Sequence, residues 1–193
     1  MNMKEVIKPA VILFVICVAV SAALAGTNLL TADRIARAAA QKAEESRMVV
    51  LPEAEAFQEK EGEDGTHYIG LSKEAPEGVV VGYVFETESK GYGGTVKVMT
   101  GINTEGNITG VIVLSHSETP GLGANAEKET FRDQYQQPVA NLTGGIQVVK
   151  FQAPAEGEIQ AMTGATITST AVTNAVNLAI EQYQNAYASE GGN

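Results

Sequence analysis

The chain has few of the residues that build several common functional sites. Its 193 residues include one cysteine, Cys17, two histidines and no tryptophan. A single cysteine excludes an intrachain disulfide and the paired cysteines of zinc and iron–sulfur sites. Basic residues are also scarce, with 13 Lys and Arg against 23 Asp and Glu, and the formal net charge is −10. Because nucleic-acid affinity comes largely from basic residues that neutralise phosphates, we expect no nucleic-acid partner.

An uncharged apolar run is the strongest signal at the amino-terminal end. Residues 9–26, PAVILFVICVAVSAALAG, approach the roughly 20 residues that cross a bilayer as a helix. A cleaved signal peptide is the alternative, because Lys4 and Lys8 precede the run and the A-L-A at 23–25 fits a cleavage pattern. The length of the run favours a retained anchor over residues 1–30. Basic residues on both sides leave its orientation undecided by charge, although either alternative exports the rest of the chain.

The sequence after the anchor predicts an α+β domain. Residues 31–52 are rich in Ala, Arg, Lys and Glu, which predicts a connecting helix that Thr31 caps and Pro52 ends. Residues 53–78 are acidic and interrupted by glycine, and are expected to form loops with a short strand at 67–71. Val and aromatic residues predict a strand at 79–89, β-branched residues predict strands at 95–102 and 107–114, and a further strand is expected at 146–151. The Asn-Thr-Glu-Gly at 103–106 has the composition of a hairpin turn.

Helices are expected towards the carboxy-terminal end. A short helix is predicted at 127–135. In the terminal segment, apolar residues recur at three- and four-residue steps at Val172, Val176, Ala179, Tyr183 and Tyr187. Clustered strands with helices at the ends favour a mostly antiparallel sheet flanked by helices over a doubly wound fold.

The segment QAMTGATITST, residues 160–170, places five hydroxyl residues at the start of that terminal helix. They are Thr163, Thr166, Thr168, Ser169 and Thr170. A helix N-terminus presents unpaired N–H groups and the positive end of the helix dipole, which together favour a phosphate. Gly164 and Ala165 leave room for a ligand beside the backbone. The same hydroxyls also suit a simple cap, because Ser and Thr are common where helices begin.

Two glycine-rich stretches precede this segment. KGYGG at 90–94 stands before a predicted strand, and ETPGLG at 118–123 follows another. Bare backbone of this kind can lie against a flat ligand, although Pro-Gly pairs also form ordinary turns. No G-x-G-x-x-G opens a helix and no G-x-x-x-x-G-K-[ST] occurs, so neither a Rossmann nor a P-loop site is expected.

Taken together, these segments resemble a family of membrane flavoproteins. TGAT at 163–166 resembles the S/T-G-A-T motif of flavoproteins that carry FMN on threonine through a phosphoester. ETPGLG at 118–123 and GYGG at 91–94 resemble the G subunit of the Rnf electron-transport complex in order and spacing. The C subunit of the sodium-pumping NADH:quinone reductase is a close relative with similar motifs, but GYGG and the short chain favour the Rnf family.

The resemblance implies an FMN-binding domain over residues 53–189 and covalent attachment of FMN to Thr166. The isoalloxazine ring is expected against ETPGLG and GYGG. The cofactor-binding residues implied are Thr166, Thr163, Gly164, Ala165, Thr168, Ser169, Glu118, Thr119, Gly121, Leu122, Gly123, Tyr92 and Gly93. The family's attachment motif usually has an acid where Gln160 stands here, and this glutamine loses the charge but keeps its hydrogen-bonding capacity.

Three roles stay open between ligand contact and ordinary structure. Glu118 is expected either to contact the flavin or to be a solvated acid in a turn. Tyr92 is expected either to stack on the flavin or to pack within the protein. His116 is assigned to structure at the end of a strand, because a single histidine near a motif is more often a satisfied polar residue.

The implied function is electron transfer in a membrane complex. The resemblance implies a component of an ion-translocating ferredoxin:NAD oxidoreductase, with the other Rnf subunits, a flavin transferase and the lipid bilayer as partners. Its domain is expected on the extracytoplasmic side of the cell membrane. Without a nicotinamide fingerprint or cluster cysteines, the chain is not expected to be catalytic alone. The alternatives are a C-subunit-like component of the sodium-pumping reductase and an exported binding or assembly module without redox function.

Overall fold

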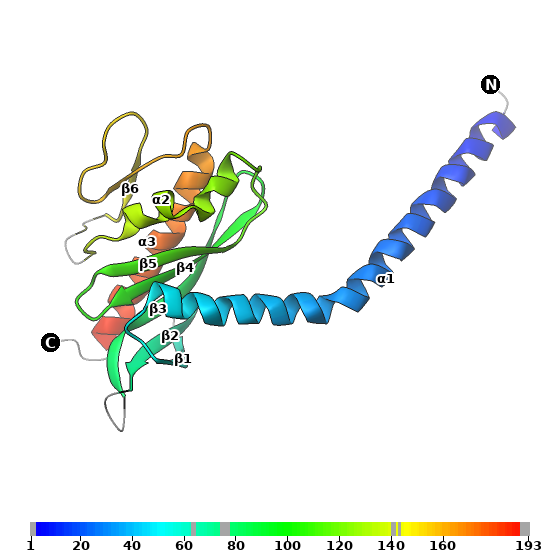
Figure 1. Ribbon diagram of the computed structural model, residues 1–193. Coiled ribbons are helices and arrows are strands. Elements are labelled where there is room, and N and C mark those ends of the chain that lie inside the picture. The colour runs from blue at the N-terminus through cyan, green and yellow to red at the C-terminus, as the bar shows by residue number, and fades with distance from the viewer. Residues whose placement is uncertain (1–2, 63–64, 74–77, 140–141, 143, 190–193) are drawn as a thin grey trace. The chain divides into compact units, whose positions relative to one another are not determined.

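The computed structural model describes residues 3–62, 65–73, 78–139, 142 and 144–189 (Figure 1). The chain divides into two units, Met1–Lys42 and Ala43–Asn193. Helix α1 (Met3–Val50) forms the described part of the first unit, and its last turns belong to the second. Within the described residues it is the one helix long and apolar enough to cross a bilayer, and its apolar segment is not buried against protein.

The helix is continuous through the position where a new helix is predicted to begin. The Thr31 hydroxyl donates a hydrogen bond to the Thr27 carbonyl at 3.0 Å, one turn earlier in the same helix. The prediction that Thr31 caps a separate helix is therefore wrong, because helix-forming sequence on both sides leaves no break for a cap. The helix ends at Val50, two residues before Pro52, as predicted.

A five-stranded antiparallel sheet forms the centre of the second unit. Its strands pair in chain order: β1 (Ala56–Gly62), β2 (Gly65–Ser72), β3 (Val79–Lys90), β4 (Thr95–Asn103) and β5 (Ile108–Ser115). The predicted strands within β2 to β5 are confirmed, as is the hairpin turn between β4 and β5. Strand β1 lies where loops were expected. Strand β1 is an exposed edge strand with the sequence AFQEKEG. Such a strand tolerates charged residues on both faces, so its sequence shows no alternation of apolar and polar residues that would have predicted it.

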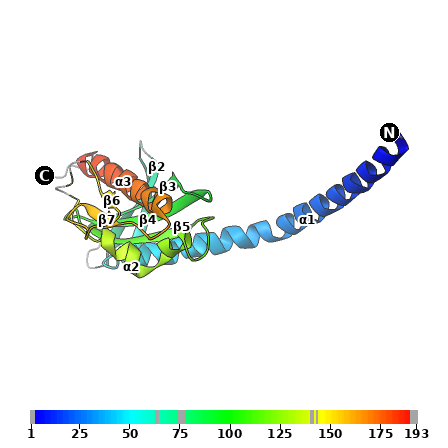
Figure 2. The same ribbon diagram turned by 90° about the horizontal axis from the view of Figure 1, so that it is seen from above.

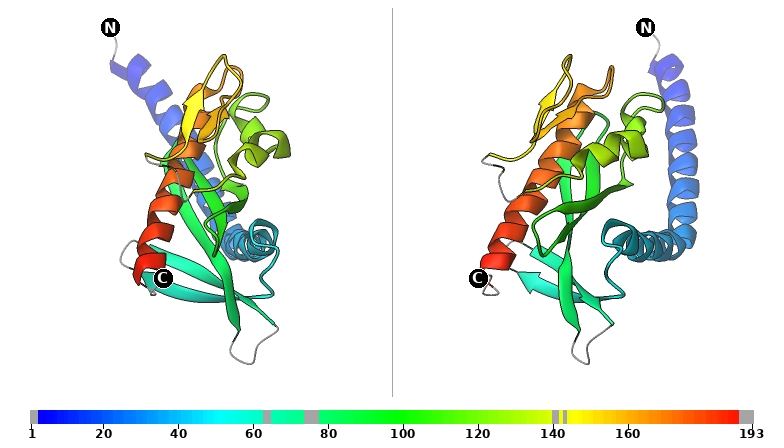
Figure 3. Two further views of the ribbon diagram at one scale, coloured as in Figure 1. Left: turned by 90° about the vertical axis from the view of Figure 1, so that its left-hand side faces the viewer. Right: turned by 60° about the vertical axis from the view of Figure 1, so that its left-hand side comes forward.

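Helix α3 (Thr166–Ser189) covers one face of the sheet (Figure 3). The predicted stripe is confirmed: Val172, Val176 and Ala179 are fully buried, and Tyr183 packs edge-on against Tyr83 of β3. On the other face, Leu51 and the end of α1 pack against Val84 and Met99. The α+β architecture with a mostly antiparallel sheet is therefore confirmed.

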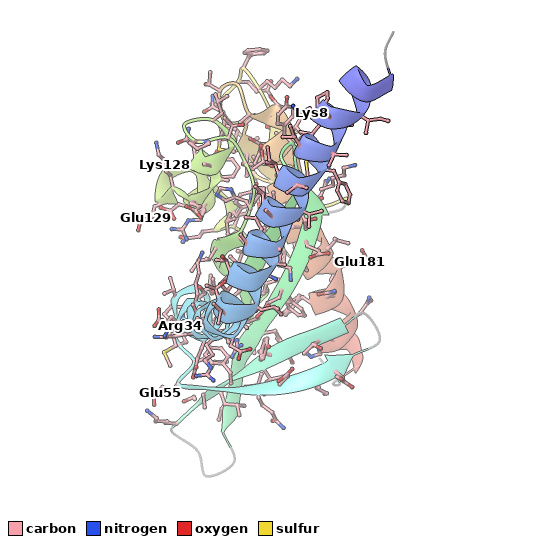
Figure 4. The ribbon with its side chains drawn as sticks, turned by 90° about the vertical axis from the view of Figure 1, so that its right-hand side faces the viewer. Lys8, Arg34, Glu55, Lys128, Glu129 and Glu181 are labelled. Carbon is pink, nitrogen blue, oxygen red and sulfur yellow. The ribbon has the colours of Figure 1, made fainter. Side chains whose placement is uncertain are left out.

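The segment between β5 and α3 is less regular than the sequence predicts. In place of one helix at 127–135, the chain forms η1 (Gly123–Glu127), α2 (Glu129–Arg132) and η2 (Asp133–Tyr135). The extended backbone of Lys128, with ψ at 138°, separates the first two elements. Lys128 and Glu129 point away from the body of the unit, as does Glu181 of α3 (Figure 4). Periodicity did not reveal this interruption.

A small parallel sheet connects this segment to α3. Strand β6 (Gln147–Val149) pairs with β7 (Glu158–Gln160) beside the start of α3 (Figure 2). The predicted strand at 146–151 is thus shorter in the structure, and β7 was not predicted, because three residues are too few to show a period. Asn177 of α3 holds this sheet in place, since its amide accepts from the Ile146 N–H at 2.8 Å and donates to the Ile146 carbonyl at 3.0 Å.

Substitution of the buried Tyr135 tests how its hydrogen bond and its ionisation affect the stability of the core. Its buried hydroxyl lies 2.8 Å from the Thr173 hydroxyl, and burial raises the pKa of Tyr135 well above its ordinary value of 10. The contribution of Tyr135 to the free energy of unfolding is therefore fully present below about pH 10. It falls as the pH rises further, because the unfolded chain then loses a proton that the folded chain keeps. We expect Tyr135→Phe to cost about 1 kcal/mol at neutral pH and to weaken this alkaline loss. Urea unfolding at pH 7 and pH 11 measures both effects, and an unchanged alkaline slope would contradict the second.

Candidate functional site

Three segments that are distant in the sequence meet at one end of the main sheet. The GYGG segment, 91–94, is the loop of the β3–β4 hairpin, closed by a hydrogen bond from the Gly91 N–H to the Gly94 carbonyl at 2.8 Å. Strand β5 finishes at the same end of the sheet, because Ser115, its last residue, pairs with Lys97 near the start of β4. The ETPGLG loop follows β5 and lies against the first turn of α3. The three motifs therefore form one site.

Glu118 links all three segments through hydrogen bonds. Its side chain is buried, with 6% of the residue exposed, so it is not a solvated turn acid. Its Oε1 atom accepts from the Gly93 N–H at 3.0 Å, and its Oε2 atom accepts from the Thr168 hydroxyl at 2.6 Å. Its own N–H donates to Nδ1 of His116 at 3.1 Å, which agrees with a structural role for that histidine.

Several of the motif glycines make room for protein rather than for a ligand. A Cβ atom on Gly91 would collide with the Oε1 atom of Glu118, and one on Gly123 would lie 2.5 Å from its Oε2 atom. A Cβ atom on Gly93 would collide with the Ser117 carbonyl. Gly121 differs, since nothing lies within 4 Å of its Cβ position and its φ of 78° requires the left-handed region. The loops thus pack closely on one another around Glu118.

The start of α3 separates its hydroxyl groups into two kinds. Thr168 and Ser169 are buried and engaged: Ser169 accepts from the Met162 N–H and donates to the Ala165 carbonyl, both at 3.0 Å. Thr166, the first residue of the helix, is half-buried and makes no side-chain hydrogen bond with the described part of the chain. Gly164 precedes it with a φ of 74°, which turns the backbone into the helix. Thr163 is exposed in the same turn.

Thr166 lies where two cavities adjoin. The first cavity, of about 560 Å³, is lined by Tyr92, Glu118, Thr119, Leu122, Gly123, Gly164, Ala165, Thr166, Ile167 and Thr168. The second, of about 630 Å³, is lined by Thr130, Phe131, Gln134, Lys150, Phe151, Gln160, Ala161, Met162, Thr163, Gly164 and Thr166. Gly164 and Thr166 contribute to both. Volumes of this size suit a cofactor.

The first cavity has an apolar, accessible rim. Tyr92 is 73% exposed, Leu122 45% and Ile167 57%. Tyr92 therefore does not pack within the described part of the protein. Thr119 holds the turn beneath Leu122, because its carbonyl accepts from the Leu122 N–H at 3.1 Å. Ile167 is not among the residues that the sequence predicts for the site, because only the fold shows that its side chain is exposed at this rim.

Gln160 lies in the lining of the second cavity. Its side chain is exposed at the end of β7, and its N–H donates to Oε1 of Gln134 at 2.7 Å. Lys150 supplies a positive charge in the same lining. Gln134 and Lys150 could not be predicted from the sequence, because neither lies in a recognisable motif and only the fold brings them to the site.

The site brings together a helix N-terminus, the Thr166 hydroxyl, which makes no hydrogen bond with the described part of the chain, and a cavity with an apolar rim. The helix N-terminus suits a phosphate, and the cavity suits the flat ring of a cofactor. Residues 91–181 match the FMN-binding domain family, and residues 1–47 match the RnfG N-terminal region. The protein is thus an FMN-binding flavoprotein. The chain belongs to the family of G subunits of ion-translocating oxidoreductase (Rnf) complexes, and it is an electron-transfer component.

Two relatives support this assignment, and one solved structure shares the fold. The chain is 41% identical over 198 residues to the G subunit of the Na(+)-translocating ferredoxin:NAD(+) oxidoreductase complex of Acetobacterium woodii, covering 94% of this chain and 93% of that protein. It is 33% identical to the G subunit of the ion-translocating oxidoreductase complex of Methanosarcina acetivorans, covering 92% and 94%. The crystal structure of Shewanella oneidensis NqrC matches with a TM-score of 0.51 and 18% identity over 72% of this chain and 73% of that one.

Proposed function

We propose that FMN is joined to Thr166 through a phosphoester and carries electrons within an Rnf complex. The observation that carries the proposal is the state of the Thr166 hydroxyl. It stands at the first residue of a 24-residue helix, lines both cavities and has no hydrogen-bond partner in the described part of the chain. The neighbouring Thr168 and Ser169 hydroxyls are already engaged by protein groups. Among the described hydroxyls of this segment, that of Thr166 alone lines both cavities, so it is the best placed to react.

The residues present fit FMN. The unpaired N–H groups of the first turn of α3 favour the phosphate, and Lys150 adds a positive charge on the side of the second cavity. Tyr92, Leu122 and Ile167 offer aromatic and apolar surface to the ring in the first cavity. Thr168 and Ser169 are assigned to holding the helix start in place rather than to contacting the phosphate. When bound, the flavin supplies the electron-carrying chemistry, and the protein orients it and sets its environment.

Attachment requires a partner enzyme. A phosphoester forms when the Thr166 oxygen bonds to phosphorus and displaces the leaving group of an activated flavin nucleotide, while the hydroxyl proton passes to a base. Among the described residues, the second cavity has no acid or histidine, and Glu118 in the first is engaged by Gly93 and Thr168. The base and the activated donor are therefore assigned to a flavin transferase. Gln160, with its exposed side chain, is positioned for recognition by that enzyme through hydrogen bonds.

The chain organisation extends this proposal to the membrane. We assign residues 1–30 to a bilayer anchor, residues 31–52 to a connecting segment and residues 53–189 to the FMN-binding domain. The single apolar helix found among the described residues supports an anchored protein. The domain is placed on the extracytoplasmic side, where the other Rnf subunits would exchange electrons with its flavin. The ferredoxin:NAD reaction belongs to that whole assembly.

The mass of the intact chain tests the attachment. The full-length protein is expressed with and without a flavin transferase, and each sample is denatured before mass measurement. We expect one FMN phosphoester per chain only when the transferase is present, with the added mass on the peptide that contains Thr166. A flavin-sized addition on another peptide, or none with an active transferase, would contradict the proposal.

A second experiment tests the anchor. The full-length protein is expected to sediment with membranes and to resist extraction by high salt or alkaline carbonate, because salt screens charge but does not remove an apolar helix from lipid. Extraction of a peripheral membrane protein from the same sample provides the control. Amino-terminal sequencing of the mature protein that begins at Gly26 would show a cleaved signal peptide instead.

A further inference from the structure

We infer that Glu118 is a positioning residue that also sets the reduction potential of the flavin. The inference rests on the proposed function, because it requires a flavin in the cavity that Glu118 lines. It assigns to this glutamate no bond to the flavin. Instead, its carboxylate holds the walls of the cavity together and places a fixed negative charge beside the ring.

The geometry identifies Glu118 as the connection between the cavity walls. Its Oε1 atom accepts from Gly93 in the β3–β4 loop, and its Oε2 atom accepts from Thr168 in the first turn of α3. Gly91 and Gly123 lack side chains at the positions that its two oxygen atoms occupy. Without this carboxylate, two donors in separate segments would lose a common acceptor.

The same hydrogen bonds indicate a charged group. One oxygen atom accepts from the Gly93 N–H and the other lies within hydrogen-bond distance of the Thr168 hydroxyl, an arrangement that a carboxylate with two acceptor oxygen atoms fits. The bond from Thr168, at 2.6 Å, has the short length typical of a hydroxyl that donates to a carboxylate. Among the described residues, no cationic side chain lines this cavity. A negative charge that is shielded from water opposes the addition of electrons nearby, so Glu118 is expected to lower the reduction potential of the flavin.

Two substitutions separate the charge from the geometry. Glu118→Gln removes the charge, but its amide oxygen can still accept from Gly93 and its amide nitrogen can donate to Thr168. We expect the flavin equilibrium to shift roughly tenfold towards the reduced form, which corresponds to about 30 mV for a two-electron couple. Thr168→Val keeps the charge of Glu118 but removes the Thr168 hydroxyl, whose hydrogen bond partly offsets that charge. The potential of this variant is expected to fall.

Spectroelectrochemical titration of full-length protein loaded with FMN measures both shifts. Glu105→Gln, at the β4–β5 turn on the opposite end of the sheet, removes an equal but exposed charge and is expected to leave the potential unchanged. A rise in Glu118→Gln with a fall in Thr168→Val supports the inference. Shifts of the same sign in both variants, or no shift in Glu118→Gln, would overturn it. If Glu118→Gln does not fold or load, the sign of the Thr168→Val shift decides.

Hydrogen exchange in the unloaded protein tests the positioning role without any flavin. The Gly93 amide donates to Glu118, so Glu118→Ala is expected to accelerate its exchange by roughly tenfold, whereas Glu118→Gln retains most of its protection. Equal exchange in wild type and Glu118→Ala would overturn the positioning role. Failure of wild type to acquire flavin would instead contradict the proposed function, and the exchange result would still stand.

Discussion

Thr166→Ala is expected to abolish covalently bound flavin while leaving the fold intact. The hydroxyl is the proposed attachment atom, and no neighbouring hydroxyl among the described residues shares its position at both cavities. Because the side chain is half-buried and makes no hydrogen bond within the described part of the chain, its loss should change the free energy of unfolding by about 0.5 kcal/mol or less. Intact mass and in-gel fluorescence after denaturation measure the attachment, and thermal unfolding measures the fold.

Matched threonines in the same segment make this result specific. Thr163→Ala and Thr170→Ala remove exposed hydroxyls on either side and are expected to retain one attached flavin per chain. Thr166→Ser keeps a hydroxyl at the same position and is expected to retain part of the attachment. A fluorescent band that persists in Thr166→Ala would place the attachment on another residue, and the peptide that carries the added mass would identify it.

Gly93→Ala is expected to lower the free energy of unfolding strongly and to distort the loop that lines the flavin cavity. An added Cβ atom would collide with the Ser117 carbonyl, and backbone on both sides leaves no flexible side chain to move away. The shift also displaces the N–H that donates to Glu118, so a buried carboxylate loses a donor. Overpacking and the lost hydrogen bond together predict a decrease of roughly 3 kcal/mol in the free energy of unfolding. Urea unfolding of the unloaded protein measures it.

Gly121→Ala is the control for this substitution. Its Cβ atom would meet nothing within 4 Å, so only the strain of its φ of 78° remains, at a cost of about 1 kcal/mol. The Glu118 hydrogen bonds and the visible spectrum of the attached flavin should be unchanged. Equal losses of stability in Gly93→Ala and Gly121→Ala would indicate that the close approach to Ser117 is relieved by a backbone shift.

The regular elements could be predicted from local sequence to the extent that each carries a clear period. Strands β3, β4 and β5 are rich in β-branched residues, and α3 has apolar residues at helical steps, so their positions followed from the chain. The same reasoning failed at β1 and β7, where an exposed edge and a three-residue strand show no period. It also failed at Thr31, where nothing in the local sequence distinguishes a cap from a helix interior.

The candidate site was predicted as a set of motifs, but their roles were not. The resemblance identified the GYGG, ETPGLG and TGAT segments and selected Thr166. The glycines were expected to admit a planar ring, whereas Gly91 and Gly123 instead admit the side chain of Glu118. Thr168 and Ser169 were expected to bind the cofactor, and their hydroxyls are engaged within the protein.

By itself, the sequence determined the family, the apolar amino-terminal helix and the strands and helix that carry a strong period. Those features depend on residues close together in the chain, whose spacing is directly readable. Only the tertiary structure decided that Glu118 joins Gly93 to Thr168, 25 residues before it and 50 residues after it. The hydrogen-bond partners of a buried carboxylate are set by which segments the sheet and helix bring together, and no local pattern records that meeting.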